Sequence, residues 1–142
     1  MATTGTQTLR ARREAVVNAH IEAEAVHHDV AAALATFHRP RYEVPAVGAI
    51  ADGPEAVHGL LGQVLGAFPD FWLKKTAVHH ADDAVIVECS FGGTHRGPWA
   101  GIAPTGNPVA VESACIFVFE GDRLVCEKVY FDHATILRQI GA

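Results

Sequence analysis

The chain has 142 residues, of which 49% are hydrophobic and 19% charged, with a formal net charge of −5 and a pI of about 5.9. This length suits one domain with a real hydrophobic core, and an acidic chain without a basic stripe argues against nucleic acid as a partner. No stretch is apolar over enough residues to act as a signal peptide or to span a bilayer, so we expect a cytoplasmic protein with no membrane partner.

The first half of the chain is expected to be mainly helical. Residues 1–7 predict a flexible leader and residues 8–142 a single domain. In residues 8–37 the apolar side chains recur at steps of three and four, which predicts one long helix that ends before Pro40. Residues 41–47 predict a short edge strand, and residues 54–68 predict a second helix with Pro54 at its first position.

The second half is expected to form strands. These are residues 71–78, 84–92, 108–119 and 123–131, with a turn at 79–83 and a short helix at 133–140. Helices come first and strands last, which indicates the α+β class. Apolar residues fall on both alternations of the strands at 84–91 and 111–119, so we expect helices on one sheet face and a second copy of the chain on the other. The sequence therefore predicts a homodimer through the outer sheet face.

Three stretches carry a resemblance to a known family: AFPDF at 67–71, GGTHRGPWAGIAPTGNPV at 92–109, and Glu127-x-x-Tyr130-x-Asp132 followed by LRQIG. In these stretches the sequence resembles the SnoaL-like polyketide cyclases, or ester cyclases, of the nuclear transport factor 2-like superfamily. The likeness covers roughly residues 10–142. It implies a cone in which a curved antiparallel sheet wraps around a long N-terminal helix, with further short helices, and encloses a pocket.

The resemblance also implies a chemistry. Cyclases of this family act on carbonyl-rich substrates without cofactor or metal, and an Asp at the start of the last helix is the general base of an intramolecular aldol condensation. Asp132 matches that position, and His95 is the candidate for an accompanying pocket histidine. We therefore expect a small, hydrophobic, polyketide-like substrate and no cofactor.

Asp132 has two possible roles. A free Asp, with a pKa of about 3.9, is a weak base for a carbon acid, so catalysis would need apolar neighbours that desolvate the carboxylate and raise its pKa. The side chains expected to do so are Val129, Tyr130, Phe131 and Ile136. The alternative is that Asp132 serves only as the N-cap of the last helix.

Five further side chains are candidates for substrate binding: Tyr130, Trp99, His28, Glu112 and Phe117. Tyr130 precedes Asp132 by two residues, so it shares the same face of an extended strand and could donate to an enolate oxygen, or simply pack in the core. Trp99 would form a flat wall for a polycyclic substrate or a core plug. His28 could reach the mouth of the cone, whereas Glu112, like Glu88, lies mid-strand and faces either the pocket or solvent.

The first helix offers a candidate metal site. His20, Glu24 and His27 are spaced i, i+4 and i+7, which places them along one helix face and suits Zn²⁺. The same face is also the ordinary polar complement of the apolar stripe, so we predict no metal.

The competing functions share the scaffold. A related isomerase, dehydratase or hydrolase would use similar acid–base chemistry, and a non-catalytic small-molecule-binding module would use only the pocket, because fold alone does not give function.

Overall fold

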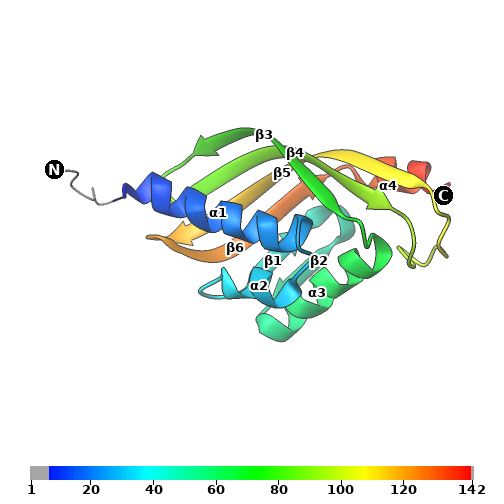
Figure 1. Cartoon of the computed structure of the whole chain (residues 1–142), viewed down its shortest axis with the longest axis horizontal. Coiled ribbons are helices and arrows are strands. Elements are labelled where there is room, and N and C mark those ends of the chain that lie inside the picture. The colour runs from blue at the N-terminus through cyan, green and yellow to red at the C-terminus, as the bar shows by residue number, and fades with distance from the viewer. Residues whose placement is uncertain (1–6, 142) are drawn as a thin grey trace.

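A curved sheet of six strands forms the body of the protein (Figure 1). The computed structural model describes residues 7–141, so the predicted leader lies outside the described residues except for Gln7. The strands run in the spatial order β2-β1-β6-β5-β4-β3. Their bounds are β1 (Arg41–Val44), β2 (Ala49–Asp52), β3 (Trp72–His80), β4 (Ala84–Thr94), β5 (Pro108–Glu120) and β6 (Arg123–Phe131). The α+β class is confirmed.

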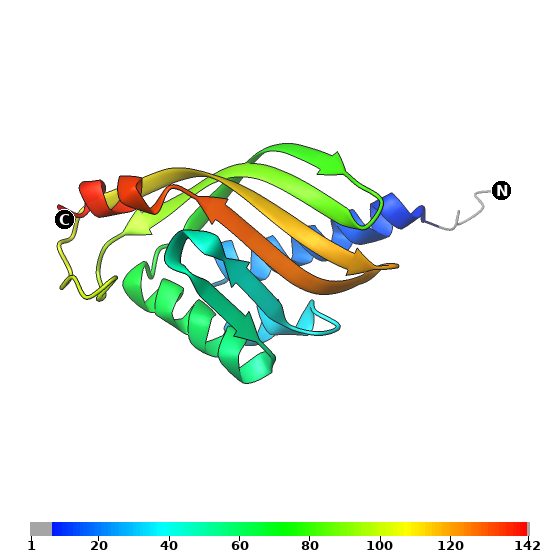
Figure 2. The same ribbon diagram turned by 180° about the vertical axis from the view of Figure 1, so that it is seen from behind.

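The helices are α1 (Leu9–Ala25), α2 (Val30–Ala35), α3 (Pro54–Ala67) and α4 (His133–Gln139), with a short 3-10 turn, η1, at Pro45–Val47. Helix α1 lies along one face of the long strands, with α2 and α3 on the same side (Figure 1). Figure 2 shows the sheet from behind, with β4, β5 and β6 in front of α1. None of the helices formed by residues 7–141 is both long and apolar enough to cross a membrane.

The single long helix predicted at residues 8–37 is wrong. The chain breaks between α1 and α2, where His28 adopts a positive φ of 52° and the side chain of Asp29 accepts a hydrogen bond from the N–H of Ala32 as the cap of α2. Apolar residues of both helices pack on the same core, so the three–four repeat continues across the break and conceals it.

Two smaller differences concern strands. The predicted edge strand at 41–47 is the first half of a hairpin, in which β1 pairs with β2 through η1 and Gly48, whose φ is 65°. Strand β3 continues to His80, because His79 and His80 pair with β4, so the predicted turn at 79–83 is reduced to residues 81–83.

Most strand pairs are antiparallel, but β1 runs parallel to β6. This pairing places Tyr42 opposite Glu127. The pairing of β5 with β6 has a register shift next to Val118. After this shift Glu127, Val129 and Phe131 of β6 face the helices, whereas Tyr130 faces outward.

The loop between β4 and β5 is fastened to the end of α3. Asp70 accepts hydrogen bonds from the N–H and the hydroxyl of Thr94, at 2.7 and 2.6 Å. The N–H of Gly97 donates to the carbonyl of Ala67 at 3.1 Å. A Cβ atom on Gly97 would overlap the carbonyl oxygen of Gly66, so glycine is required for this approach. The stretches at 67–71 and 92–109 thus form one scaffold.

We expect Gly97→Ala to lower the free energy of unfolding by about 1–3 kcal/mol, because the methyl group forces the loop away from α3. Gly59→Ala is the matched control. Gly59 is an exposed residue of α3 with open space around its Cβ position, so alanine should stabilise the protein by about 0.5–1 kcal/mol. Urea unfolding measures both variants, and an undiminished stability of Gly97→Ala would contradict the close approach.

Candidate active site

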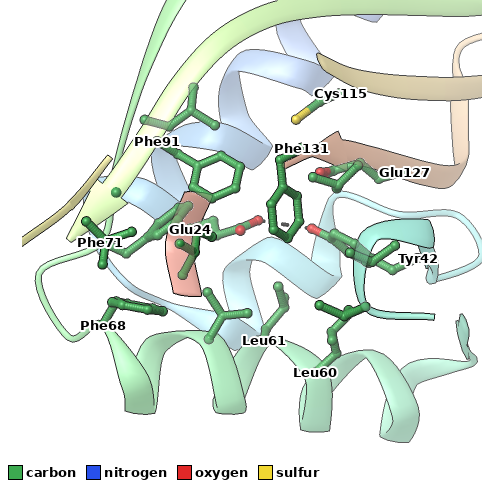
Figure 3. A pocket seen from close by; sticks show the side chains of 18 of the residues that line it. Glu24, Tyr42, Leu60, Leu61, Phe68, Phe71, Phe91, Cys115, Glu127 and Phe131 are labelled. Atoms are coloured by element: carbon green, nitrogen blue, oxygen red, sulfur yellow. Dashed lines mark hydrogen bonds between the residues drawn. The ribbon is translucent and has the colours of Figure 1, made fainter. Parts of the chain in front are cut away.

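A cavity of about 90 Å³ lies between α3 and the helix-facing side of the sheet (Figure 3). We call it the inner cavity. Its walls are mainly aliphatic and aromatic: Val44, Leu60, Leu61, Val64, Phe68, Phe71, Leu73, Phe91, Val109, Val129, Phe131 and Ile136 are among the lining residues. Three acidic or phenolic side chains interrupt this surface, Glu24 from α1, Tyr42 from β1 and Glu127 from β6. The cavity is therefore apolar with a small convergent polar group, the usual composition of a ligand site.

His20 lies behind these three side chains and connects them. Its Nε2 atom is 3.0 Å from Oε2 of Glu24, 3.0 Å from Oε1 of Glu127 and 2.7 Å from the hydroxyl oxygen of Tyr42. The Tyr42 hydroxyl also lies within donor distance of Glu24, at 3.0 Å. We call His20, Glu24, Tyr42 and Glu127 the buried cluster.

Sequence and topology together assemble the buried cluster. His20 and Glu24 are one turn apart on α1, so their side chains share a helix face. Tyr42 and Glu127 are brought side by side by the parallel pairing of β1 with β6. The rings of Phe37 and Phe117 pack edge-on against His20, with centroids 5.3 and 5.7 Å away.

The orientation of His20 is fixed from its other nitrogen. Nδ1 lies 2.8 Å from the hydroxyl oxygen of Thr36, and that hydroxyl donates its own hydrogen to the carbonyl of Ala33 at 2.6 Å. The Thr36 oxygen is then left to accept, so the proton of this bond resides on Nδ1 of His20. Nε2 is consequently directed at the carboxylates.

Burial sets the electrostatics of the cluster. His20 is 1% exposed and Glu127 4% exposed. Burial alone disfavours the imidazolium, but the carboxylates of Glu127 and Glu24 outweigh it and raise the pKa of His20 to about 10. Burial raises the pKa of Glu127, although the His20 contact opposes this. Burial and both carboxylates likewise raise the pKa of Tyr42. The cluster is thus able to hold and exchange protons beside an apolar space.

Asp132 lies elsewhere. Its carboxylate caps α4, accepting from the N–H of Ala134 at 3.1 Å and from the hydroxyl of Thr135 at 2.8 Å. The side chain is 62% exposed and borders an outward-facing groove shared with Trp72 and Glu112. The expectation of a raised pKa is wrong, because the Thr135 hydroxyl lowers the pKa of Asp132. Of the four side chains expected to desolvate it, Val129, Phe131 and Ile136 line the inner cavity instead, and Tyr130 is exposed. Asp132 therefore acts as the N-cap of α4, and its role as a catalytic base stays a prediction.

His95 is fully buried in the loop after β4. Its Nδ1 accepts from the N–H of Thr105 at 3.2 Å and lies 2.9 Å from the Thr105 hydroxyl, which ties together the two ends of the loop. Its ring packs at 5.9 Å from that of Phe68. His95 therefore stabilises the loop. No contact between His95 and the buried cluster supports the predicted catalytic role.

Trp99 contributes to two spaces. It lines the inner cavity and also an outer groove of about 660 Å³, which shares Val47 and Leu60 with the cavity. Its indole N–H donates to Nε2 of His133 at 3.0 Å. The side chain therefore stands as a wall between the inner cavity and the outer groove.

The remaining candidates lie apart from the inner cavity. His28 donates from Nε2 to the carbonyl of Phe71 at 2.7 Å. Tyr130 and Glu112 are exposed on the outer sheet face, Tyr130 by 44%. Phe117 is buried against His20 and so supports the cluster from behind. Glu88 is also exposed and pairs with His79 at 2.7 Å.

The helical spacing of His20, Glu24 and His27 correctly brings together only two of the three residues. His20 and Glu24 do meet, but His27 lies beyond the end of α1, is 61% exposed and contacts Glu22. The third group beside His20 is Glu127, which is 107 residues away in the chain and which no local spacing could supply.

Tyr42 and Glu127 were not selected from the sequence as site residues. A signal existed for Glu127, because it begins the motif that also contains Tyr130 and Asp132, and it shares its strand alternation with Val129 and Phe131. A carboxylate in phase with buried apolar residues is costly unless it is paired, which marks it as a candidate. Tyr42 gave no comparable signal.

Comparison with known proteins agrees with this architecture. The family model described as SnoaL-like polyketide cyclase matches residues 14–140. A search of the curated proteins finds no match. Among solved structures, a candidate SnoaL-like polyketide cyclase from Jannaschia Sp. CCS1 has 16% identity and a TM-score of 0.84, with 99% of each chain covered.

Two further structures are similar. A hypothetical protein with a ketosteroid isomerase-like fold from Catenulispora acidiphila DSM 44928, in complex with trimethylamine, has 25% identity and a TM-score of 0.75, with 89% of this chain and 92% of that chain covered. AclR, a candidate hydroxylase from Streptomyces galilaeus, has 20% identity and a TM-score of 0.78, with coverage of 92% and 82%. The predicted nuclear transport factor 2-like fold is confirmed, and with a family model matching nearly its whole length the chain belongs to the SnoaL-like polyketide cyclase family.

Proposed function

We propose that this protein is a cyclase-type enzyme that removes a proton from carbon in a small, hydrophobic, carbonyl-rich substrate and closes a ring by intramolecular aldol addition. The observation that carries the proposal is the composition of the inner cavity, in which Glu24, Tyr42 and Glu127 converge within otherwise apolar walls. An apolar cavity selects the substrate class, and the convergent groups supply acid–base catalysis.

Glu127 is the base in this proposal. Its buried Oε1 atom lies 3.0 Å from Nε2 of His20, whose single proton also faces Glu24 and Tyr42, so the carboxylate keeps a lone pair for a carbon-bound proton. A carboxylate in an apolar environment is also a stronger base than one in water, which suits the acidic C–H between two carbonyl groups. Proton transfer from carbon leaves an enolate delocalised over the substrate.

The rest of the cluster provides hydrogen-bond donors. The Tyr42 hydroxyl lies 3.0 Å from Glu24, and Nε2 of a protonated His20 lies 3.0 Å from Glu127. Either donor can stabilise a substrate oxygen that gains negative charge. The enolate carbon then adds to a second carbonyl of the same molecule. The resulting alkoxide recovers the proton removed at the first step, so the ring closure is an isomerisation that balances without a cofactor.

Size constrains how a substrate would bind. A cavity of about 90 Å³ accommodates the reacting end of a molecule but not a whole polycyclic ligand. A larger substrate would extend past Trp99 into the outer groove, which adjoins the cavity at Val47 and Leu60. In this proposal Trp99 keeps its predicted role as a flat wall against the substrate, with His133 holding the indole in place.

Asp132 remains the rival assignment for the base. It could act only on a substrate bound in the outward-facing groove near Glu112, and its lowered pKa makes it a weak base. The two assignments make opposite predictions for conservative amide variants, since Glu127→Gln and Asp132→Asn each remove one basic oxygen and little volume.

We expect Glu127→Gln to reduce the rate of proton abstraction by roughly 10²–10⁴-fold, because the base of the inner cavity is lost. Asp132→Asn should retain a near wild-type rate, since asparagine is also a good helix cap. The measurement is deuterium incorporation at the acidic carbon of an aryl β-keto ester in D₂O, followed by NMR and corrected for exchange in buffer alone.

Thermal unfolding of both variants provides the control for folding. A stable Glu127→Gln protein with full exchange activity would remove Glu127 as the base. Loss of exchange in a stable Asp132→Asn protein would instead restore Asp132 to that role. Absence of any exchange above the buffer rate in the wild-type protein, over a panel of β-keto esters and 1,3-diketones, would favour the non-catalytic binding module.

An isomerase or dehydratase on the same scaffold is the alternative. Proton abstraction from carbon by Glu127 is common to these reactions, so the exchange measurement alone does not separate them. Product analysis with a linear substrate that carries a second ketone does, because only the cyclase forms a new carbon–carbon bond.

We also propose that the chain forms a homodimer through the outer sheet face. Ile86, Ala114, Ile116 and Val118 lie on the alternation opposite to the buried core residues and are only half-buried in the single chain. Helices α1, α2 and α3 lie on the other side of the sheet (Figure 2). An apolar sheet face of this kind is typical of an interaction surface.

We expect Ile116→Glu to shift the protein from dimer to monomer, because it places a carboxylate in the centre of this face. Ile50→Glu is the matched control, since Ile50 is 67% exposed on β2, away from the long strands. Sedimentation velocity measures both. A wild-type monomer, or a dimer that persists in Ile116→Glu, would contradict the interface.

A further inference from the structure

The buried cluster also has the features of a metal site. We propose that His20, Glu24 and Glu127 bind a divalent cation of the Zn²⁺ class at the inner wall of the cavity. This goes beyond the proposed reaction, which belongs to the metal-free protein, because a bound ion would occupy the carboxylates of Glu24 and Glu127.

The ligand atoms already converge. Nε2 of His20 is 3.0 Å from an oxygen of Glu24 and 3.0 Å from an oxygen of Glu127, and the three atoms all lie within 4.8 Å of one another. Zn²⁺ binds nitrogen and carboxylate oxygen at about 2.0–2.2 Å, so two ligand atoms at a right angle around it are roughly 3 Å apart. A cation can therefore enter with only small side-chain movements.

A second observation points to the same place. Oε1 of Glu127 is buried, and the donor beside it is Nε2 of His20 at 3.0 Å, whose single proton also faces Glu24 and the Tyr42 hydroxyl. The side chain is 94% buried, and a carboxylate that shares one donor proton with two other oxygens is poorly compensated for its lost hydration. A cation coordinated by this oxygen would compensate for that loss.

His20 is arranged as a metal ligand commonly is. Histidines that bind metals usually donate the second ring N–H to an oxygen, which fixes the tautomer and the ring orientation. Here Nδ1 donates to the Thr36 hydroxyl, which is itself anchored to the Ala33 carbonyl. The Tyr42 hydroxyl within 3.0 Å of Glu24 similarly orients a ligand carboxylate.

Charge favours a dication. Once an ion has displaced the Nε2 proton, His20 is neutral and the two ionised carboxylates carry a formal charge of −2, which a divalent ion cancels in the buried cluster. One nitrogen and two oxygens suit Zn²⁺ and Co²⁺ better than Mg²⁺, which prefers oxygen and retains its water. Glu24 and Glu127 line the inner cavity, so an ion bound between them could take water or a substrate carbonyl from that space.

The other histidine–carboxylate contacts lack these features. His79 with Glu88 and His27 with Glu22 are two-residue pairs with side chains more than half exposed. His80 with Glu14 is also a two-residue pair, and its carboxylate is 47% exposed. They provide internal controls, because a cation that binds any histidine near a carboxylate would bind these pairs as well.

The experiment uses the full chain after chelator treatment. Zn²⁺ is titrated by calorimetry, and Co²⁺ by its visible absorption, which reports coordination by the protein. We expect one ion per chain and at least a tenfold weaker affinity in Glu127→Gln and in Glu24→Gln. His79→Asn should bind as the wild type does. Binding should also release protons and weaken as the pH falls, because the ion replaces a proton on the cluster.

Thermal unfolding shows whether each variant is folded, and Glu24→Gln provides a second variant because Glu24 is partly exposed, at 15%. Absence of saturable one-to-one binding, wild-type affinity in the two glutamine variants, or loss of binding in His79→Asn would overturn the site. If the chelator-treated protein catalyses proton exchange but binds no Zn²⁺, the metal site is contradicted and the proposed function is not. If the protein binds Zn²⁺ but its metal-free form catalyses no exchange of substrate protons, the proposed function is contradicted and the metal site is not.

Discussion

The burial of Glu127 is the constraint on which the interior of this protein depends. A carboxylate taken out of water costs several kcal/mol unless it is paired, and here the partner is His20, reached across the core from α1. The contact fixes α1 against β6 and places polar atoms in an otherwise apolar region. Replacing these residues by apolar ones would still fill the space, so their presence is better explained by a use of the site than by stability.

Two separate systems divide the molecule. Asp70, Thr94, His95 and Gly97 form a scaffold that holds the β4–β5 loop against α3. The buried cluster lies at the other side of the inner cavity, on α1, β1 and β6. The stretches at 67–71 and 92–109 are thus largely structural, whereas the third stretch contributes Glu127 to the buried cluster, and His20, Glu24 and Tyr42 come from outside all three. Trp99 connects the two systems, because it belongs to the scaffold loop and lines the cavity.

Much of the fold could be predicted from the chain. The long strands, α3 and α4 follow from apolar periodicity, from Pro54 at a helix start and from Asp132 at a helix cap, all of which act over a few residues. The break between α1 and α2 could not, since it depends on a single residue with positive φ inside an uninterrupted apolar repeat. The parallel pairing of β1 with β6 is likewise a long-range choice that no local pattern encodes.

The site divides in the same way. The sequence by itself determined the family, made Asp132 a candidate cap of α4, and placed His20 and Glu24 on a shared helix face, because each depends on neighbours in the chain. Only the tertiary structure decided that Glu127 and Tyr42 complete the cluster, that Asp132 faces outward, and that His95 supports a loop. The physical reason is that a one-residue change of strand phase moves a side chain from the cavity to the surface, and that phase is set by pairing between distant strands.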